Sequence, residues 1–162
     1  MAKVMMLCGK IASGKSVYAE RIKEQQKAVM LSVDELVLSA LGNDLGEKHD
    51  EITTRIQAYF FDKSVEIIQA GANVVLDWGF WTRQRRMQAR KFYRERGIAC
   101  EFHHIDVPDD VWHRNIALRN QAVLSGKSDA YYVDEGLMKK LESLFEKPEE
   151  DEIDVWIVND WR

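Results

Sequence analysis

Proline, cysteine and long apolar stretches are scarce in this chain. Two prolines and nine glycines among 162 residues exclude collagen-like and linker-dominated architectures. No stretch of membrane-spanning length lacks a charge. The apolar run that opens the chain stops at Gly9, too early for the core of a signal peptide. These features predict a cytoplasmic globular protein that does not enter a membrane.

Cysteine and histidine provide little material for a metal centre or a disulfide. Cys8 and Cys100 are isolated, and each lies in or closes a strand-like apolar run, which favours two buried thiols. His103 and His104 are adjacent on a predicted strand and therefore face opposite ways, and the other two histidines are distant in sequence. We therefore expect no cluster of cysteine or histidine metal ligands.

The chain also lacks an excess of positive charge. Its 23 Lys and Arg against 27 Asp and Glu give a net charge of −4, which excludes a uniformly basic nucleic-acid-binding surface but allows a local basic patch. Hydrophobic residues make up 46% of the chain and charged residues 31%, a balance typical of a folded globule. The length fits one domain, so we expect residues 1–162 to form a single unit.

Apolar runs typical of strands alternate with helical patterns. The expected strands are 4–8, 28–33, 74–76, 98–106 and 154–158, and the expected helices are 17–26, 35–41, 50–70, 82–96, 109–124 and 134–146. This alternation predicts an α/β fold of three layers, with a five-stranded parallel sheet whose first two strands are buried and helices on both faces. Ligands of such sheets bind at the carboxyl ends of the strands, where Gly9, Asp34, Asp77 and Asp106 fall.

Residues 9–16 read GKIASGKS and match the pattern G-x-x-x-x-G-K-[ST] without a mismatch. Glycines let such a loop curl so that its N–H groups point at phosphate oxygens, and the following helix adds its positive dipole end. The lysine reaches the outer phosphates and the serine hydroxyl binds Mg²⁺. The motif predicts a site for ATP and Mg²⁺ built from Gly9, Ile11, Ala12, Ser13, Gly14, Lys15, Ser16 and Val17.

Two aspartates follow predicted strands. Asp34 comes after the second strand, where a carboxylate can orient or deprotonate an attacking hydroxyl; the alternative is a helix N-cap. Asp77 closes the third strand, where it can contact Mg²⁺ or the phosphoryl acceptor; the alternative is a strand-end cap. The pattern predicts catalysis by Lys15 and Asp34, metal binding by Ser16 and Asp77, and substrate contacts for both aspartates.

Arginines offer the positive charge that phosphoryl transfer requires. Arg114 and Arg119 lie on the helix after the fourth strand and precede the loop 126–129. We expect residues 109–133 to form a helical lid that closes over the nucleotide, with Arg119 a catalytic contact to the phosphates and Arg114 a second nucleotide contact. The alternative is an ordinary solvated helix.

A second arginine set lies on the helix predicted at 82–96. Four-residue spacing aligns Arg86, Arg90 and Arg94. Arg86 is within reach of the third strand's end and is a candidate contact for the acceptor, whereas pairing of the stripe with the acidic stretch 149–152 is the alternative. Trp78, directly after Asp77, lines an acceptor pocket or covers the core.

Over nearly its whole length the chain resembles the small P-loop kinases related to zeta toxins, chloramphenicol phosphotransferase and the kinase domain of polynucleotide kinase. The likeness rests on residues 9–16, on the stretches 32–35 and 75–77 with the arginines after the latter, on Arg114 and Arg119, and on residues 144–148. It implies a P-loop NTPase/kinase fold with ATP and Mg²⁺. By the same likeness Asp34 matches the catalytic acid and Arg119 a lid arginine. Trp78 and Gly79 depart from the small or polar residues that relatives often carry.

These observations lead to the hypothesis of an ATP-dependent phosphotransferase that moves the γ-phosphate to a hydroxyl of a small molecule. One alternative is a 5′-hydroxyl nucleic-acid kinase that uses the stripe of Arg86, Arg90 and Arg94. The other is a nucleotide-dependent switch or binding module that has no acceptor. The sequence leaves open which small molecule, ATP or GTP, and which oligomeric state the protein uses.

Overall fold

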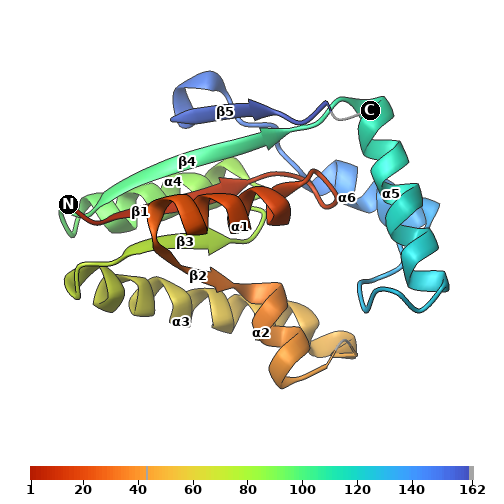
Figure 1. The fold of residues 1–162 in the computed structure, drawn as a ribbon, viewed down its shortest axis with the longest axis horizontal. Helices are drawn as coiled ribbons and strands as arrows, with labels where there is room; N and C mark the ends of the chain where they lie inside the picture. The colour runs from red at the N-terminus through yellow and green to blue at the C-terminus, as the bar shows by residue number, and fades with distance from the viewer. Residues whose placement is uncertain (43, 161–162) are drawn as a thin grey trace.

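The computed structural model describes residues 1–42 and 44–160 and contains one parallel sheet. Its strands are β1 (Lys3–Cys8), β2 (Ala28–Ser32), β3 (Asn73–Asp77), β4 (Ala99–Asp106) and β5 (Val155–Val158). They lie in the order β2-β3-β1-β4-β5, and every neighbouring pair is parallel (Figure 1). The predicted five-stranded parallel sheet is therefore confirmed.

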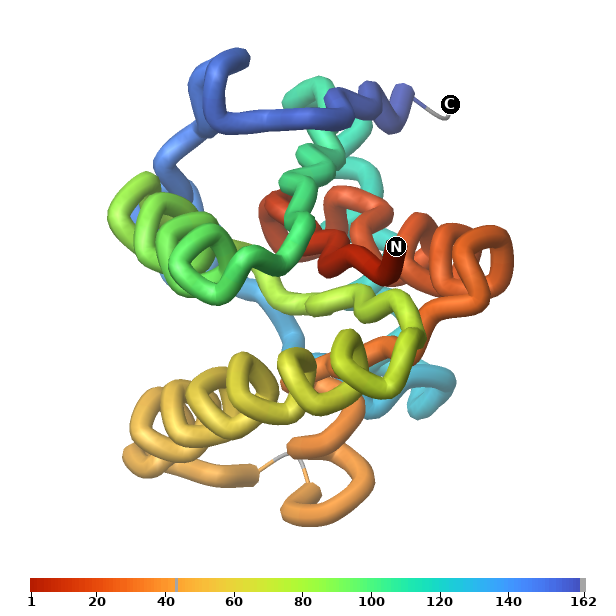
Figure 2. The backbone as a smooth tube through the Cα atoms, turned by 90° about the vertical axis from the view of Figure 1, so that its left-hand side faces the viewer, coloured from red at the N-terminus to blue at the C-terminus, as the bar shows by residue number. Residues whose placement is uncertain are grey.

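Helices cover both faces of this sheet, as predicted. Helix α1 (Lys15–Gln26) lies on one face, and α3 (His49–Gln69) and α4 (Arg83–Arg94) lie on the other (Figure 2). The remaining helices, α2 (Val33–Ala40), α5 (Asp109–Leu124) and α6 (Glu135–Leu144), gather toward the carboxyl ends of the strands (Figure 1). Short 3₁₀ turns cover Gly46–Lys48 and Glu150–Glu152. None of the helices in the described part of the chain is both long and apolar enough to cross a membrane.

The middle strand β1 forms the centre of the core because both of its faces are covered. Val4 and Met6 point into the cluster beneath α3 and α4, whereas Met5 and Leu7 point toward α1, and all four are at most 1% exposed. The expectation that the second strand is equally buried was wrong. Val29 of β2 is 43% exposed, because β2 is the edge of the sheet and lacks a neighbour on one side.

Local signals set where the helices begin, and the observed ends lie within two residues of the expected ones. Gly14 adopts a left-handed conformation with φ of 89°, which only glycine takes without strain, and α1 starts at once at Lys15. The Ser32 hydroxyl accepts the N–H of Glu35 and caps α2. Both starts lie at the carboxyl edge of the sheet, and they bring the phosphate motif and Asp34 to the same end of the molecule.

Candidate active site

The loop that joins β1 to α1 has the form expected for phosphate binding. The Gly9 N–H donates to the Gly79 carbonyl over 3.2 Å, and within the loop the Ser13 N–H donates to the Lys10 carbonyl over 3.3 Å. Residues after Gly14 continue directly into the first turn of α1, whose N–H groups lack carbonyl partners within the helix. These free N–H groups at the helix terminus, directly after the loop, are suited to an anion.

Lys15 and Asp77 meet at this place. The Lys15 ammonium nitrogen lies 2.5 Å from one carboxylate oxygen of Asp77, whose side chain is 7% exposed. Strand β3 is the direct neighbour of β1, and this adjacency brings the two residues together although 62 positions separate them. The Lys15 ammonium group is thus held by a carboxylate directly after the phosphate loop.

The donors near the loop fit a magnesium ion in their chemistry. Ser16 offers a hydroxyl on the exposed side of α1, and Asp77 offers a carboxylate; hard oxygen donors of this kind are those that Mg²⁺ prefers. Within the described residues, no group of three or more His, Cys, Asp or Glu side chains is arranged to hold a metal by itself.

Asp34 lies at the same edge of the sheet as the phosphate loop. Its preceding strand pairs with β3 so that Ser32 is opposite Asp77, and Asp34 follows two residues later in the first turn of α2. The Asp34 side chain is exposed, in contrast to the buried Asp77. Because Ser32 supplies the N-cap of α2, the Asp34 carboxylate is left for other contacts.

Arg119 of α5 comes close to Asp34 from the opposite side. Burial lowers the pKa of the Arg119 guanidinium, and the negative charge of Asp34 acts against this change. Burial likewise raises the pKa of Tyr131, and Asp34 and Asp44 raise it further. The Tyr131 carbonyl oxygen lies 3.5 Å from Arg119 Nε. The Tyr131 ring packs edge to face with the His49 ring, with 5.9 Å between the ring centroids. The segment after α5 therefore reaches across to α2 and the start of α3.

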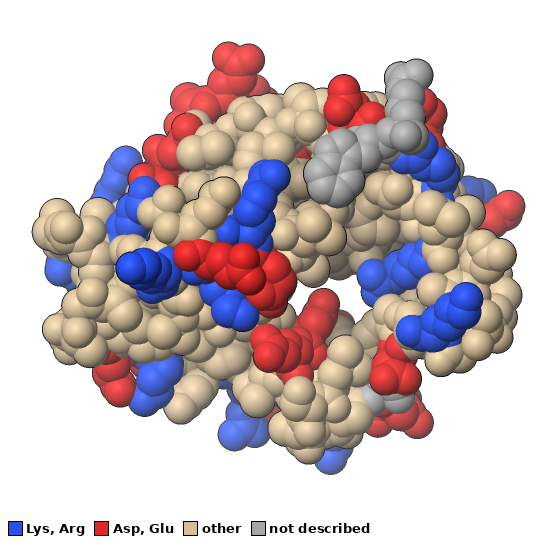
Figure 3. All heavy atoms as spheres, viewed as in Figure 1, with Lys and Arg blue, Asp and Glu red and all other residues tan. Residues whose placement is uncertain are grey.

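The surface is hollowed between these elements. Figure 3 shows the hollow between the sheet, α2 and the α5 side, with acidic groups along its lower border and basic groups on its right. Arg114 belongs to the same helix as Arg119 and is exposed, and its neighbour Asn115 contacts the phosphate loop. A nucleotide in this hollow would have the loop on one side and the arginine helix on the other.

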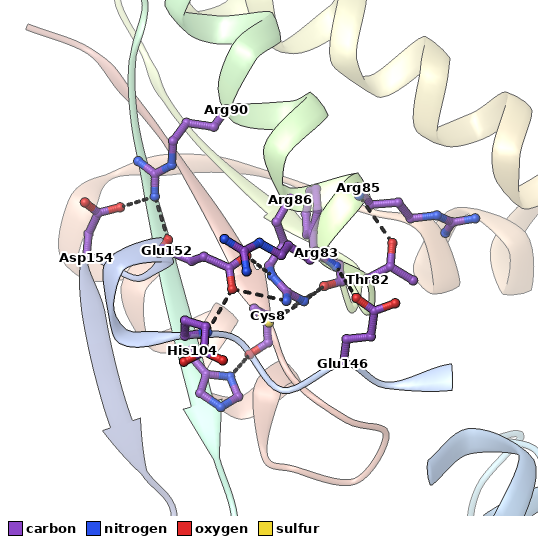
Figure 4. A network of polar contacts seen from close by, with 12 residues as sticks. Cys8, Thr82, Arg83, Arg85, Arg86, Arg90, His104, Glu146, Glu152 and Asp154 are labelled. Carbon is purple, nitrogen blue, oxygen red and sulfur yellow. Dashed lines mark hydrogen bonds and ion pairs between the residues drawn. The ribbon is translucent and has the colours of Figure 1, made fainter. Parts of the chain in front are cut away.

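Arg86 does not lie as the sequence suggested. Its side chain is 2% exposed, it pairs with Glu152 over 3.0 Å, and it donates to the Phe80 carbonyl over 2.9 Å (Figure 4). Arg90 beside it donates to the Glu152 carbonyl and to Asp154, each over 2.8 Å. The expected acceptor contact of Arg86 is thus corrected: the alternative, pairing of the stripe with the acidic stretch, describes both side chains.

Trp78 belongs mainly to the core, which was the alternative expectation. It is 8% exposed and stacks with Phe80 at 5.0 Å and Phe60 at 6.2 Å between ring centroids. Part of its surface lines a groove of about 440 Å³ between α3 and α4, on the face away from α1. A contact between Trp78 and an acceptor therefore requires that the acceptor reach this groove.

The thiols behave differently from each other. Cys8 is buried, and burial raises its pKa to about 12, so that it stays protonated and unreactive. Cys100 is only half-buried, which corrects the expectation that both thiols are buried. Both are free cysteines, and neither lies among the residues that meet at the phosphate loop.

Several residues around the site had no signal in the sequence. Tyr131 lies in a polar loop, and the pattern there gave no reason to single it out. Trp112, Asn115 and Asn159 contact the phosphate loop through its carbonyl oxygens, and they lie about 100 or more positions away in sequence. Nothing in a single sequence links positions so distant when the contact is made to backbone.

One family model matches this chain. The model is AAA_33, described as an AAA domain, and it matches residues 4–148, which include the phosphate loop, both aspartates and the arginines of α5. Among the curated proteins, none matches.

Solved structures share the fold. The APS kinase CysC of Mycobacterium tuberculosis, in complex with AMPPNP and APS, has a TM-score of 0.69 and 20% identity, over 99% of this chain and 90% of that one. A gluconokinase from Sinorhizobium meliloti has a TM-score of 0.63 and 15% identity, over 98% of this chain and 82% of that one. A chain of the Pnkp1/Rnl/Hen1 RNA repair complex has a TM-score of 0.70 and 18% identity, over 88% of this chain and 43% of that one. The fold of this chain is therefore that of P-loop kinases.

Proposed function

Because the chain belongs to the AAA_33 family of AAA domains, and its fold is that of P-loop kinases, we propose that it is an ATP-dependent phosphotransferase. It moves the γ-phosphate of ATP to a hydroxyl of a small molecule. The observation that supports this proposal is that Lys15 of the phosphate loop, Asp34 at the start of α2 and Arg119 on α5 come to the same end of the molecule, with Arg119 close enough to Asp34 for their charges to interact. A site that only held a nucleotide would need the first of these but neither of the others.

Each residue has a distinct task in the proposed reaction. Lys15 leaves Asp77 and binds the outer phosphates, where its charge offsets the negative charge of the triphosphate. Asp34 accepts the proton of the acceptor hydroxyl as its oxygen forms a bond to the γ-phosphorus, while the bond from that phosphorus to the bridging oxygen of ADP breaks. Arg119, with Arg114 as a second contact, balances the charge on the transferred group.

A magnesium ion would be held by Ser16 and Asp77. Such an ion neutralises charge on the β- and γ-phosphates. Asp77 has two oxygens, and it can serve this ion once Lys15 has turned to the phosphates. We propose that the segment 109–133 acts as the lid, since α5 and the loop after it already reach toward α2.

The proposed acceptor is a small molecule. Two of the similar structures are a gluconokinase and an APS kinase, and the latter holds APS together with AMPPNP. A nucleic-acid acceptor has the likeness to the RNA repair complex in its favour. Its phosphates would need the basic stripe of α4, however, and Arg86 and Arg90 are engaged with Glu152 and Asp154. The small-molecule acceptor is therefore the better supported proposal.

The test is a transfer assay with [γ-³²P]ATP and Mg²⁺ against pooled sugars, nucleosides, other hydroxyl metabolites and 5′-hydroxyl oligonucleotides. The wild-type chain labels one pool, and Lys15→Ala serves as the blank. Asp34→Asn loses transfer but binds ATP with unchanged affinity. Glu35→Gln is the matched control, because Glu35 is the exposed neighbour of Asp34 on the same helix.

Two results would overturn the proposal. Full transfer by Asp34→Asn removes the proposed role of its carboxylate. Failure of the wild-type chain to bind any nucleotide in calorimetry with Mg²⁺ present removes the phosphotransferase altogether. Labelling of the oligonucleotide pool alone would instead establish the nucleic-acid kinase.

A further inference from the structure

The carbonyl oxygens of the phosphate loop are held from outside by side chains of distant elements. Helix α5 supplies two of these contacts. Trp112 donates its indole N–H to the Ile11 carbonyl over 2.8 Å, and Asn115 donates to the Ala12 carbonyl over 3.1 Å. Trp112 is 1% exposed, so its N–H depends on this partner.

A third contact comes from the end of the sheet. Asn159, directly after β5, donates to the Ser13 carbonyl over 2.8 Å. Its amide group lies so close to Gly14 that a Cβ at position 14 would overlap it. Gly14 is therefore required twice, for its positive φ and for the close approach of Asn159.

The turn after β3 binds both the N–H and the carbonyl of Gly9 at the start of the loop. Gly79 accepts the Gly9 N–H over 3.2 Å, and Trp81 donates its indole N–H to the Gly9 carbonyl over 3.2 Å. A Cβ at position 79 would overlap the Trp81 indole, which explains the glycine there. The stretch of Trp78 and Gly79 that departs from related kinases thus belongs to a turn that grips the phosphate loop.

Outward carbonyls have a direct effect on the inward side of the loop. A trans peptide group is planar, and its C=O and N–H point in opposite directions. Holding the carbonyls of Gly9, Ile11 and Ser13 outward therefore turns the N–H groups of Lys10, Ala12 and Gly14 toward the inside of the loop. These are the groups that a phosphate would meet.

We propose that Trp81, Trp112 and Asn159 are positioning residues that set the affinity of the loop for phosphate. They form an outer clamp, which keeps the amide groups aimed before a nucleotide arrives, so that binding does not have to order them. The inference rests on the nucleotide site of the proposed function. It also means that α5 both aims the loop, through Trp112, and carries Arg119, the proposed contact to the transferred phosphate.

The experiment measures the affinity of Trp112→Phe and Asn159→Leu for ATP, ADP, AMP and tripolyphosphate by calorimetry. Each variant keeps most of the side-chain volume and removes one donor. A hydrogen bond to a carbonyl contributes about 1 kcal/mol, so each variant should lose roughly 5-fold in ATP affinity and the double variant roughly 30-fold. Tripolyphosphate should lose the same factor as ATP, and AMP should lose less, because it meets fewer of the amide groups.

The control is Trp156→Phe, which makes the same change on β5 at a side chain that is 36% exposed and packs on His104. Its affinity for ATP should match the wild type. Circular dichroism and thermal unfolding show whether each variant is folded. If Trp112→Phe does not fold, Asn159→Leu alone tests the proposal.

The outcomes separate this inference from the proposed function. Folded variants that bind ATP as tightly as the wild type, or lose the same factor for AMP as for tripolyphosphate, overturn the outer clamp and leave the phosphotransferase standing. A wild-type chain that binds none of the four compounds overturns the proposed function, and the clamp with it.

Discussion

Arg86 and Arg119 are both arginines near the carboxyl edge of the sheet, but their surroundings are opposite. Arg86 is 2% exposed, and its guanidinium meets the Glu152 carboxylate and the Phe80 carbonyl at hydrogen-bond distances (Figure 4). Arg119 is half-buried, and its Nε lies at the long distance of 3.5 Å from the Tyr131 carbonyl oxygen. The first arginine is fully engaged inside the fold, and the second is held loosely beside Asp34.

The comparison shows how burial and partners distinguish a structural arginine from a candidate catalytic one. Phe80 has φ of 44°, an unusual value for a residue with a bulky side chain, and Arg86 fixes its carbonyl. This turn carries Gly79 and Trp81, which hold the phosphate loop. Arg86 therefore supports the site from behind, whereas Arg119 faces it. Variants of the two arginines should fail in different assays.

The largest effect is expected for Arg119→Ala. Loss of an arginine that stabilises a transferring phosphoryl group costs about 10³-fold or more in kcat. The free energy of unfolding should change by no more than about 0.5 kcal/mol, because the Arg119 side chain has no close ion pair among residues 1–42 and 44–160. Steady-state kinetics and urea denaturation on the same preparation check both statements. Arg119→Lys is the companion variant and should recover part of the rate; an unchanged kcat for Arg119→Ala would remove Arg119 from the reaction.

The second-largest effect is expected for Glu152→Ala, which removes the carboxylate that pairs with Arg86. It leaves the Arg86 charge buried without its carboxylate, and such a loss typically costs about 3–5 kcal/mol in the free energy of unfolding. Urea denaturation measures it. Glu150→Ala on the same 3₁₀ turn is the control, since Glu150 is exposed, and it should stay within about 0.5 kcal/mol. A stable Glu152→Ala would mean that Arg86 finds another partner.

The sequence was sufficient for the fold and for one part of the site. The alternation of apolar runs and helices predicted the parallel sheet, and the glycine-lysine motif of residues 9–16 marked the loop between β1 and α1, where Gly14 takes a positive φ. The edge position of β2 was missed, because strand order depends on tertiary packing and not on the local pattern.

The arginines show where a single sequence stops being informative. Regular spacing placed Arg86 and Arg90 on one helix face, but spacing does not reveal whether that face meets solvent, a ligand or a carboxylate. Here Glu152 and Asp154 return to α4 only because the last strand joins the sheet beside β4. Trp112 and Asn115 were missed for a related reason, since their partners are backbone carbonyls that any residue carries.

Acid should weaken the stabilisation that the ion pair of Arg86 and Glu152 gives to the fold. Burial alone would raise the pKa of Glu152, but the hydrogen bonds from Arg86 and from the Glu149 N–H bring it below its ordinary value of 4.5. A carboxylate whose pKa is lowered on folding stabilises the protein above the unfolded value, and this contribution is lost as the pH falls through the folded value. The stability difference between wild type and Glu152→Gln should therefore be constant from pH 7 to about 5 and shrink below 4.5. Urea titrations at several pH values measure it, and a difference that grows in acid would contradict the assignment.

The smallest effect is expected at the outer pair of the same network. Arg90 and Asp154 are 2.8 Å apart, but their side chains are 19% and 41% exposed, so that water screens the attraction. A double-mutant cycle with Arg90→Gln and Asp154→Asn should give a coupling energy below about 1 kcal/mol, and 1 M NaCl should reduce it further. Asp154 also accepts the Phe102 N–H, and Asn retains an acceptor for that bond, so the cycle isolates the charge. A coupling as large as that of Arg86 with Glu152 would show that burial is not what separates the two pairs, and the distinction drawn between Arg86 and Arg119 would then need another physical basis.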